Sequence, residues 1–107
     1  MYAVDAMWSV PGGQAEWMAG LEASVIPFIT TLPGFVSARF TRNLSEQCNH
    51  SSLVFETKEN AERFIEVSYP APERTEARDD AGVKLLGKMA IHEVLVEVTA
   101  VTSGSAG

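Results

Sequence analysis

The sequence contains a single cysteine, Cys48, and only two histidines, His50 and His92. One cysteine cannot form a disulfide within the chain, which agrees with a reducing compartment such as the cytoplasm. Metal sites usually need three or four ligands, and Cys48 and His50 have no second cluster of ligand residues elsewhere in the sequence. We therefore expect no metal ion, and no neighbouring base is evident that would activate Cys48 as a nucleophile.

Clusters of basic residues and long apolar runs are also lacking. Eight Lys and Arg stand against 14 Asp and Glu, and the bases are scattered, with a formal net charge of −6. Nucleic-acid binding needs clustered bases that neutralise phosphates, and an acidic surface repels anionic lipids. No apolar run approaches the ~20 residues of a membrane span, and the opening MYAVDAMW lacks the basic start of a signal peptide. We expect a cytoplasmic protein without nucleic-acid or membrane partners.

What is present is the composition of an ordinary globular domain. Hydrophobic residues make up 46% and charged residues 21% of the 107 residues, which is enough for one modest core. We expect a single domain over residues 1–101 and a flexible tail over residues 102–107, where TSGSAG is small and polar.

Strand and helix patterns alternate along the first half of the chain. YAVDAMWSV alternates as a strand, and residues 14–32 carry an apolar stripe at helical spacing that Pro27 should kink or break. FVSARFTR and SSLVFE form two further strands, joined by the polar turn NLSEQCN. These two strands are predicted to form a hairpin.

The second half repeats the pattern with a longer final strand. Thr57 is expected to cap a helix that ends near Val67, and a short helix should follow the double-proline break and end at Gly82. From Ala90 to Val101 the sequence alternates again, and at ~3.3 Å per residue this strand would span roughly 35 Å. Such a length predicts a strand that extends onto a second copy of the protein.

The order of these elements indicates an α+β fold. Strand, helix, strand, strand, helix, strand is the ferredoxin-like βαββαβ order, with an antiparallel four-stranded sheet and both helices on one face. Both sides of the first and third strands are partly hydrophobic, so the open face of the sheet needs a cover. We expect a homodimer that packs sheet against sheet.

Two motifs connect the chain to a known family. PGF at Pro33 to Phe35 starts the second strand, and FETKENAERF at Phe55 to Phe64 joins the third strand to a helix. Over about Ala3 to Val101 the chain resembles the dimeric α/β-barrel superfamily, and within it the antibiotic biosynthesis monooxygenase-like proteins. This resemblance implies a dimeric barrel with a pocket between the sheet and helices of each subunit. It also implies a cofactor-independent monooxygenase that oxidises a small phenol, quinol or polyketide-like aromatic.

The sequence departs from the family at two places. The family's usual tryptophan at the end of the third strand is replaced by Phe55, so no indole N–H is available there. Heme-degrading relatives carry a histidine on the second helix, and no histidine lies between Lys58 and Gly82. The resemblance therefore implies no heme, and the scattered glycines form no loop that would bind a nucleotide cofactor.

Arg39 and His92 are the candidate catalytic residues. Arg39 has a fork of donors that fits a phenolate or carboxylate, although an ion pair with one of the many acids is the alternative. His92 has a side chain suited to proton transfer near neutral pH, although its position in line with valines also fits a core or interface histidine. His50, beside the polar turn, fits a surface position.

Four other residues are candidates for the substrate pocket. Family position makes Phe55 a pocket wall, and the alternative is a core aromatic that anchors the following helix. Trp8 lies on the apolar side of the first strand and fits either core packing or a ligand contact. Tyr69 and Arg74 flank the double-proline break, where the loop is a connector or a lid over a pocket.

Two functions of different classes remain open. The first is the monooxygenase, in which the substrate itself reduces oxygen and the protein orients it in a dry pocket. The second is a noncatalytic dimer of the same fold that binds a small molecule or serves as an interaction module.

Overall fold

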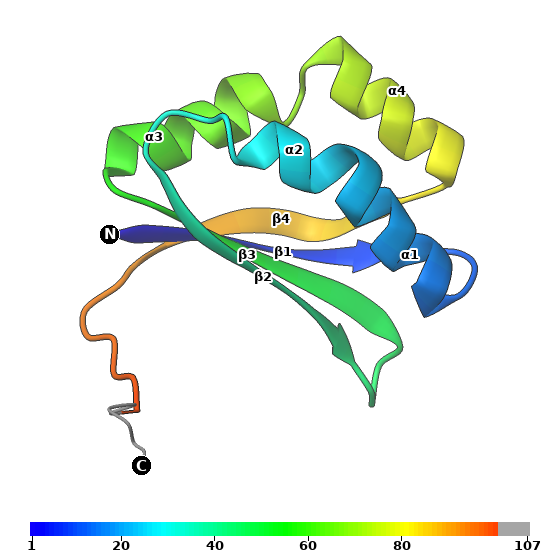
Figure 1. Cartoon of the computed structure of the whole chain (residues 1–107), viewed down its shortest axis with the longest axis horizontal. Helices are drawn as coiled ribbons and strands as arrows, with labels where there is room; N and C mark the ends of the chain where they lie inside the picture. Colours follow the sequence, from blue (N-terminus) through cyan, green and yellow to red (C-terminus); the bar gives the residue numbers. More distant parts are fainter. Residues whose placement is uncertain (101–107) are drawn as a thin grey trace.

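A computed structural model describes residues 1–100, in which four strands form one antiparallel sheet (Figure 1). The sheet order is β2-β3-β1-β4, and the strands are β1 (Tyr2–Ser9), β2 (Phe35–Asn43), β3 (Cys48–Phe55) and β4 (Lys84–Glu93). Each neighbouring pair is antiparallel. The predicted α+β, ferredoxin-like fold is confirmed, while the tail at 102–107 lies outside the described residues.

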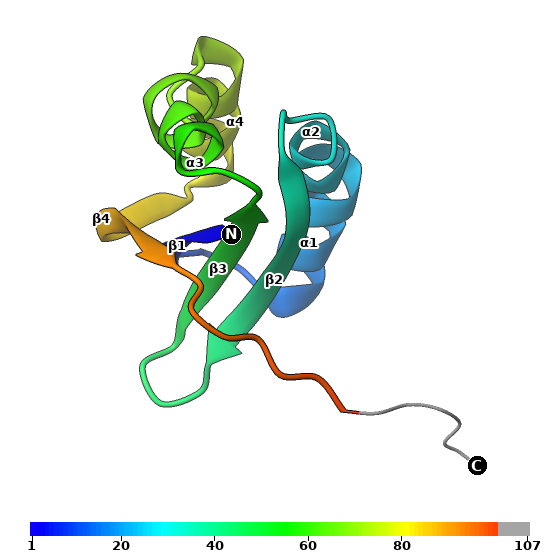
Figure 2. The same ribbon diagram turned by 90° about the vertical axis from the view of Figure 1, so that its left-hand side faces the viewer.

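All helical segments lie on one face of this sheet and leave the other face open. Figure 2 shows them as two rows above the strands, with α1 and α2 in one row and α3 and α4 in the other. The first row is formed by α1 (Gln14–Gly20), a π-helical turn η1 (Leu21–Val25) and α2 (Ile26–Ile29); the second by α3 (Lys58–Arg63), the π-helical turn η2 (Phe64–Ser68) and α4 (Pro72–Ala81).

The sequence predicted a kink or a break of the helix at Pro27, and the structure instead has a π-helical turn just before it. The proline ring would clash with the carbonyl four residues before it in a regular α-helix. Here the Ile26 N–H bonds to the Leu21 carbonyl five residues back, as in a π-helix. The helical row therefore continues through Pro27 to Ile29, three residues short of the predicted end.

The junction between β3 and α3 is tied to the PGF turn. Thr57 caps α3 as predicted, because its Oγ1 accepts the Asn60 backbone N–H at 3.1 Å and also donates to Asn60 Oδ1 at 2.6 Å. Gly34 has a φ of 72°, and its carbonyl accepts the Glu56 N–H at 2.8 Å. A Cβ at position 34 would collide with the Asn60 side chain, so only glycine fits this turn.

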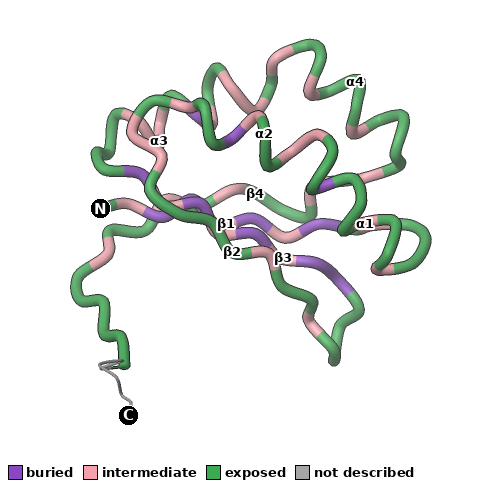
Figure 3. The backbone as a smooth tube through the Cα atoms, viewed as in Figure 1, coloured by how far each residue is buried: buried purple, intermediate pink, exposed green. Residues whose placement is uncertain are grey.

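The core lies between the two central strands and the helices. Figure 3 shows buried segments concentrated along β1 and β3. The buried cluster consists of Val4, Ile29, Leu53, Phe55, Ala61 and Phe64.

The final strand differs from the prediction at both ends. It runs from Lys84 to Glu93 instead of Ala90 to Val101. A register shift opposite Asp5 and Met7 breaks the alternation in its first half, which hid that half from sequence reasoning. The last bond of its pairing with the β1 segment is donated by the Val94 N–H to the Met1 carbonyl, at 2.9 Å. Residues 94–100 carry no regular structure, and Val101 lies outside the described part.

Candidate functional site

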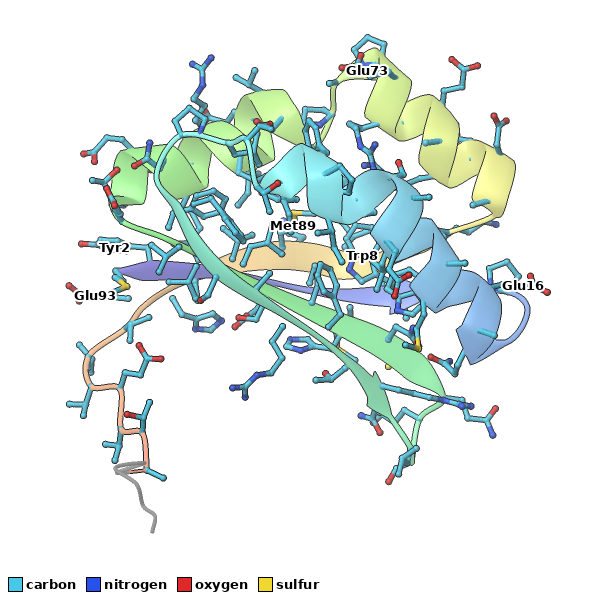
Figure 4. All side chains as sticks on the ribbon, in the orientation of Figure 1. Tyr2, Trp8, Glu16, Glu73, Met89 and Glu93 are labelled. Atoms are coloured by element: carbon cyan, nitrogen blue, oxygen red, sulfur yellow. The ribbon has the colours of Figure 1, made fainter. Side chains whose placement is uncertain are left out.

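A cavity of about 500 Å³ lies between the sheet and the two helical rows. Its floor is formed by inward side chains of the four strands, and its walls are formed by α1, η1, α2, both ends of η2 and α4. The principal lining residues are Val4, Ala6, Trp8, Leu21, Ser24, Val25, Phe28, Phe40, Ser51, Leu53, Phe64, Tyr69, Arg74, Arg78 and Met89. Trp8 and Met89 are labelled in Figure 4, where both lie between the strands and the helices. The lining is mostly apolar and aromatic, as is usual for a small-molecule site.

The polar element of the floor is a pair formed by Trp8 and Ser51. The Trp8 indole N–H donates to Ser51 Oγ at 2.9 Å, and the two residues are only 8% and 5% exposed. Because Oγ is the acceptor in this bond, the hydroxyl hydrogen of Ser51 is not used by it. Ser51 can therefore donate that hydrogen to an oxygen atom of a ligand in the cavity.

Tyr69 continues the aromatic wall from Trp8 to α4. The two rings are 6.0 Å apart at 54°, and the Arg78 guanidinium carbon lies 4.0 Å from the centroid of the Tyr69 ring. Arg78 also donates to the Tyr69 carbonyl at 2.8 Å. Stacking and hydrogen bonding together fix Tyr69 and Arg78 relative to one another.

Arg74 links α4 to the opposite helical row. Its Nη1 donates to Ser24 Oγ in η1 at 2.9 Å, and its guanidinium carbon lies 4.8 Å from the centroid of the Phe28 ring. The pKa of Arg78 is lowered, first by burial and then by the positive charge of Arg74; Tyr69 and Asp79 act in the opposite direction. An arginine remains charged despite such a shift, so both side chains bring a positive charge to the cavity.

The structure brings three of the six predicted site residues to this cavity: Trp8, Tyr69 and Arg74. Phe55 does not line it. Its side chain is 1% exposed, and its ring packs against Phe35 at 6.2 Å and Phe64 at 5.7 Å. Phe55 is therefore a core residue that anchors the helix after β3, which is the alternative that its sequence position allowed.

Arg39 and His92 lie on the opposite, open face of the sheet. Successive side chains of a strand point to opposite faces, and Phe40 lines the cavity, so the exposed Arg39 points away from it. The His92 side chain is 60% exposed, and its Nε2 is 3.4 Å from Asp5 Oδ2. The sheet therefore separates both residues that were expected to be catalytic from the cavity of the same chain.

Several cavity residues were not found from the sequence. Ser51 shares a face of β3 with Leu53 and Phe55. The alternation of this strand could therefore have predicted Ser51 as a polar side chain that faces the interior. Arg78 follows Arg74 by four residues, which places both on one face of a helix. Ser24 and Phe28 gave no comparable signal, because their role depends on how the two helical rows meet.

Two further findings concern the described residues as a whole. Within residues 1–100, no three His, Cys, Asp or Glu side chains are grouped so that they could hold a metal ion. None of the helices in this part of the chain is both long enough and apolar enough to cross a membrane.

Comparisons with known proteins find similarity in structure only. No protein-family model and no curated protein sequence matches the chain. HapK from Hahella chejuensis is 13% identical with a TM-score of 0.70, over 94% of this chain and 99% of HapK. SnoaB, a cofactor-independent oxygenase from Streptomyces nogalater, is 14% identical with a TM-score of 0.65, over 92% of this chain and 97% of SnoaB.

The monooxygenase ActVA-Orf6 of Streptomyces coelicolor, in complex with the ligand nanaomycin D, is 16% identical with a TM-score of 0.61, over 94% of this chain and 92% of that chain. At such identities the similarity establishes the fold. The chain shares the fold of HapK, SnoaB and ActVA-Orf6, which agrees at the level of fold with the resemblance seen in the sequence.

Proposed function

We propose that this protein is a cofactor-independent monooxygenase that acts on a small electron-rich aromatic such as a phenol, quinol or anthrone. The observation that supports this proposal is the aromatic cavity with the Trp8–Ser51 pair in its floor. An apolar cavity of this size accepts a ring system, and a single donor in the floor orients an oxygen substituent of that ring. The oxygenase and monooxygenase functions of structural neighbours support the same class of reaction.

The chemistry requires oxygen as the only co-reactant. A phenol that loses its proton becomes a strong electron donor and can reduce oxygen directly. Oxidation of an anthrone CH₂ group to a ketone breaks two C–H bonds, places one oxygen atom on carbon and releases the other as water. The Ser51 hydroxyl would hold the phenolate oxygen, and the apolar wall around Trp8 would exclude bulk water.

This function is tested by oxygen uptake with a panel of hydroquinones and anthrones. We expect one molecule of oxygen per molecule of anthrone, and a loss of kcat of about 10²-fold in Ser51→Ala because the donor to the developing oxyanion is removed. Arg39→Ala and His92→Ala are matched controls that should keep the wild-type kcat, since both residues lie across the sheet. If no compound in the panel consumes oxygen faster with the protein than in buffer alone, the proposed monooxygenase activity is refuted.

A noncatalytic binding protein of the same fold is the second candidate. Both histidines, the groups best suited to proton transfer at neutral pH, lie on the open face, in a shallow depression with Asp5 and Lys88. Within residues 1–100, the floor of the cavity therefore contains no histidine. Binding of an aromatic compound at the cavity with no oxygen consumption would support this second function.

We also propose that a second copy of the chain covers the open face. Met7, Leu86 and Ala90 lie in its shallow depression, and Leu95, Val96 and Val98 are 83%, 77% and 85% exposed just after β4. Asp5 Oδ1 is buried and has no hydrogen-bond partner within residues 1–100, so a donor from another molecule would satisfy it. A cytoplasmic location stays a prediction from the sequence.

Sedimentation velocity at micromolar concentration tests this cover. We expect twice the chain mass of 11.6 kDa, and dissociation after truncation at Glu93, because the truncation removes the exposed apolar segment. A compact species of single-chain mass in the intact protein would contradict the homodimer.

A further inference from the structure

We infer that the ligand of the cavity is an aromatic anion, with a carboxylate or sulfonate group held between Arg74 and Arg78. This inference names the substrate class for the cavity described above, and it rests on the proposed function only in taking that cavity as the substrate site. Three features of the α4 side of the cavity support it: the positive charge of the two arginines, their unused N–H donors and the shape of the cavity.

The two guanidinium groups face the same space. Arg74 and Arg78 are four residues apart on α4, so they lie on one face of that helix, and both line the cavity. Burial and, to a smaller extent, the positive charge of Arg74 lower the pKa of Arg78, so the two like charges act on one another. An anion between them would relieve that repulsion.

Neither guanidinium has a carboxylate partner within the described part of the chain. The chain has 14 acidic residues against eight basic ones, yet the one ion pair within 4.0 Å in residues 1–100 joins His92 to Asp5. Glu16 and Asp80 also line the cavity but do not pair with either arginine. Two partly buried, unneutralised arginines in an acidic protein indicate a site for an anion from outside the chain.

Arg74 and Arg78 both have N–H donors without a partner in the described residues, and other contacts hold their side chains in place. Within residues 1–100, Arg74 uses Nη1 for Ser24, and Arg78 uses Nη2 for the Tyr69 carbonyl and for Thr75 at 3.3 Å. Each guanidinium has five N–H donors, so most of them remain free. Contacts with the Phe28 and Tyr69 rings add to these hydrogen bonds in holding the two guanidinium groups in place.

The rest of the cavity fits the aromatic part of such a ligand. Trp8, Phe40 and Met89 in the floor and Phe28 in the wall provide apolar surface, and the volume of about 500 Å³ suits a ligand of two or three rings. An anionic group at α4 would leave the far end of the ring system near Ser51. The arginines would then select the ligand, and Ser51 would hold its reacting end.

A matched pair of fluorescent probes tests the anion requirement. The sulfonate 1-anilinonaphthalene-8-sulfonate and the neutral N-phenyl-1-naphthylamine share one ring skeleton and differ in charge. We expect the intact protein to bind the sulfonate at least about tenfold more tightly than the neutral probe, because charge-assisted hydrogen bonds add to the shared apolar contact.

Substitutions then assign the preference to the two arginines. Arg74→Gln and Arg78→Gln should each raise the Kd of the sulfonate about tenfold and leave the Kd of the neutral probe within about twofold. Arg63→Gln is the matched control, since it removes one positive charge from α3 without touching the cavity. Circular dichroism confirms that each variant is folded, and Arg74→Met and Arg78→Met, which remove the charge but keep an unbranched side chain, replace any variant that is not.

Several results would overturn the inference. They are equal affinity of the two probes, a preference for the sulfonate that survives both arginine substitutions, and no binding of either probe to the intact protein. Sulfonate bound on exposed apolar surface, such as residues 94–98, would give the second of these results. Selective binding of the sulfonate without oxygen uptake would refute the proposed monooxygenase activity but not the inferred anionic ligand. Oxygen uptake with neutral phenols and no selectivity for the sulfonate would refute the inferred anionic ligand but not the activity.

Discussion

The two faces of the sheet are made from the same four strands but are built for different surroundings. On the face under the helices, Trp8 and Ser51 are buried and satisfy one another through a hydrogen bond. On the open face, His92 is 60% exposed, and Asp5 keeps one buried oxygen without a partner within residues 1–100. The Trp8–Ser51 pair is therefore satisfied within one chain, whereas Asp5 on the open face has an unpaired oxygen in the described residues.

The difference arises from single-residue steps along each strand. Phe40 and Ser51 line the cavity, while their neighbours Arg39 and His50 point to the other side. Because side chains alternate with a period of two, a shift of one residue exchanges an aromatic wall for a charged surface. Residue type alone is therefore a poor guide to the site in this fold, and the side of the sheet decides which residues can meet a ligand.

The largest effect that tests this comparison is expected at Phe55, in the core of the covered face. Phe55→Ala should lower the free energy of unfolding by about 3–5 kcal/mol, because it removes a fully buried ring and leaves a cavity between Phe35 and Phe64. Urea unfolding followed by circular dichroism measures the loss. Leu44→Ala is the control, since Leu44 is 83% exposed and should change stability by no more than about 0.5 kcal/mol. Similar losses for both variants would show that the covered face is not the stable core described here.

A smaller effect is expected in the floor of the cavity. Trp8→Phe and Ser51→Ala should each cost about 1–2 kcal/mol of unfolding free energy, since each removes one partner of the hydrogen bond that Trp8 donates to Ser51. Because the two residues share that bond, the double variant should cost less than the sum of the single variants. Urea unfolding of all four proteins measures the coupling. His92→Ala on the open face should cost less than either floor variant, and strict additivity at Trp8 and Ser51 would mean that the bond contributes nothing.

Much of the fold could be predicted from local patterns. The alternation of Tyr2 to Val10 and the cap at Thr57 indicated elements that the structure contains, and α4 ends at Gly82 in the left-handed conformation as expected. These features depend on contacts between residues that are close in sequence, so the local sequence is enough to determine them. The last strand was misplaced because its length depends on β1, which lies far away in the sequence.

The site was predictable only in part. Trp8, Tyr69 and Arg74 line the cavity, and each was chosen for its place on an apolar face or beside an irregular loop. Arg39 and His92 were chosen for their chemistry, and the sheet places them on the other face. The hydrogen bond between Arg74 and Ser24 joins residues 50 positions apart, so no local sequence pattern predicts it.

The sequence by itself determined the order of strands and helices, the composition of the core and the exclusion of a disulfide within the chain. The tertiary structure alone decided which polar groups meet across the cavity and which are left facing outward. The physical reason is that periodicity and capping act over a few residues, whereas a binding site is formed where separate elements pack, at distances that no short stretch of sequence controls.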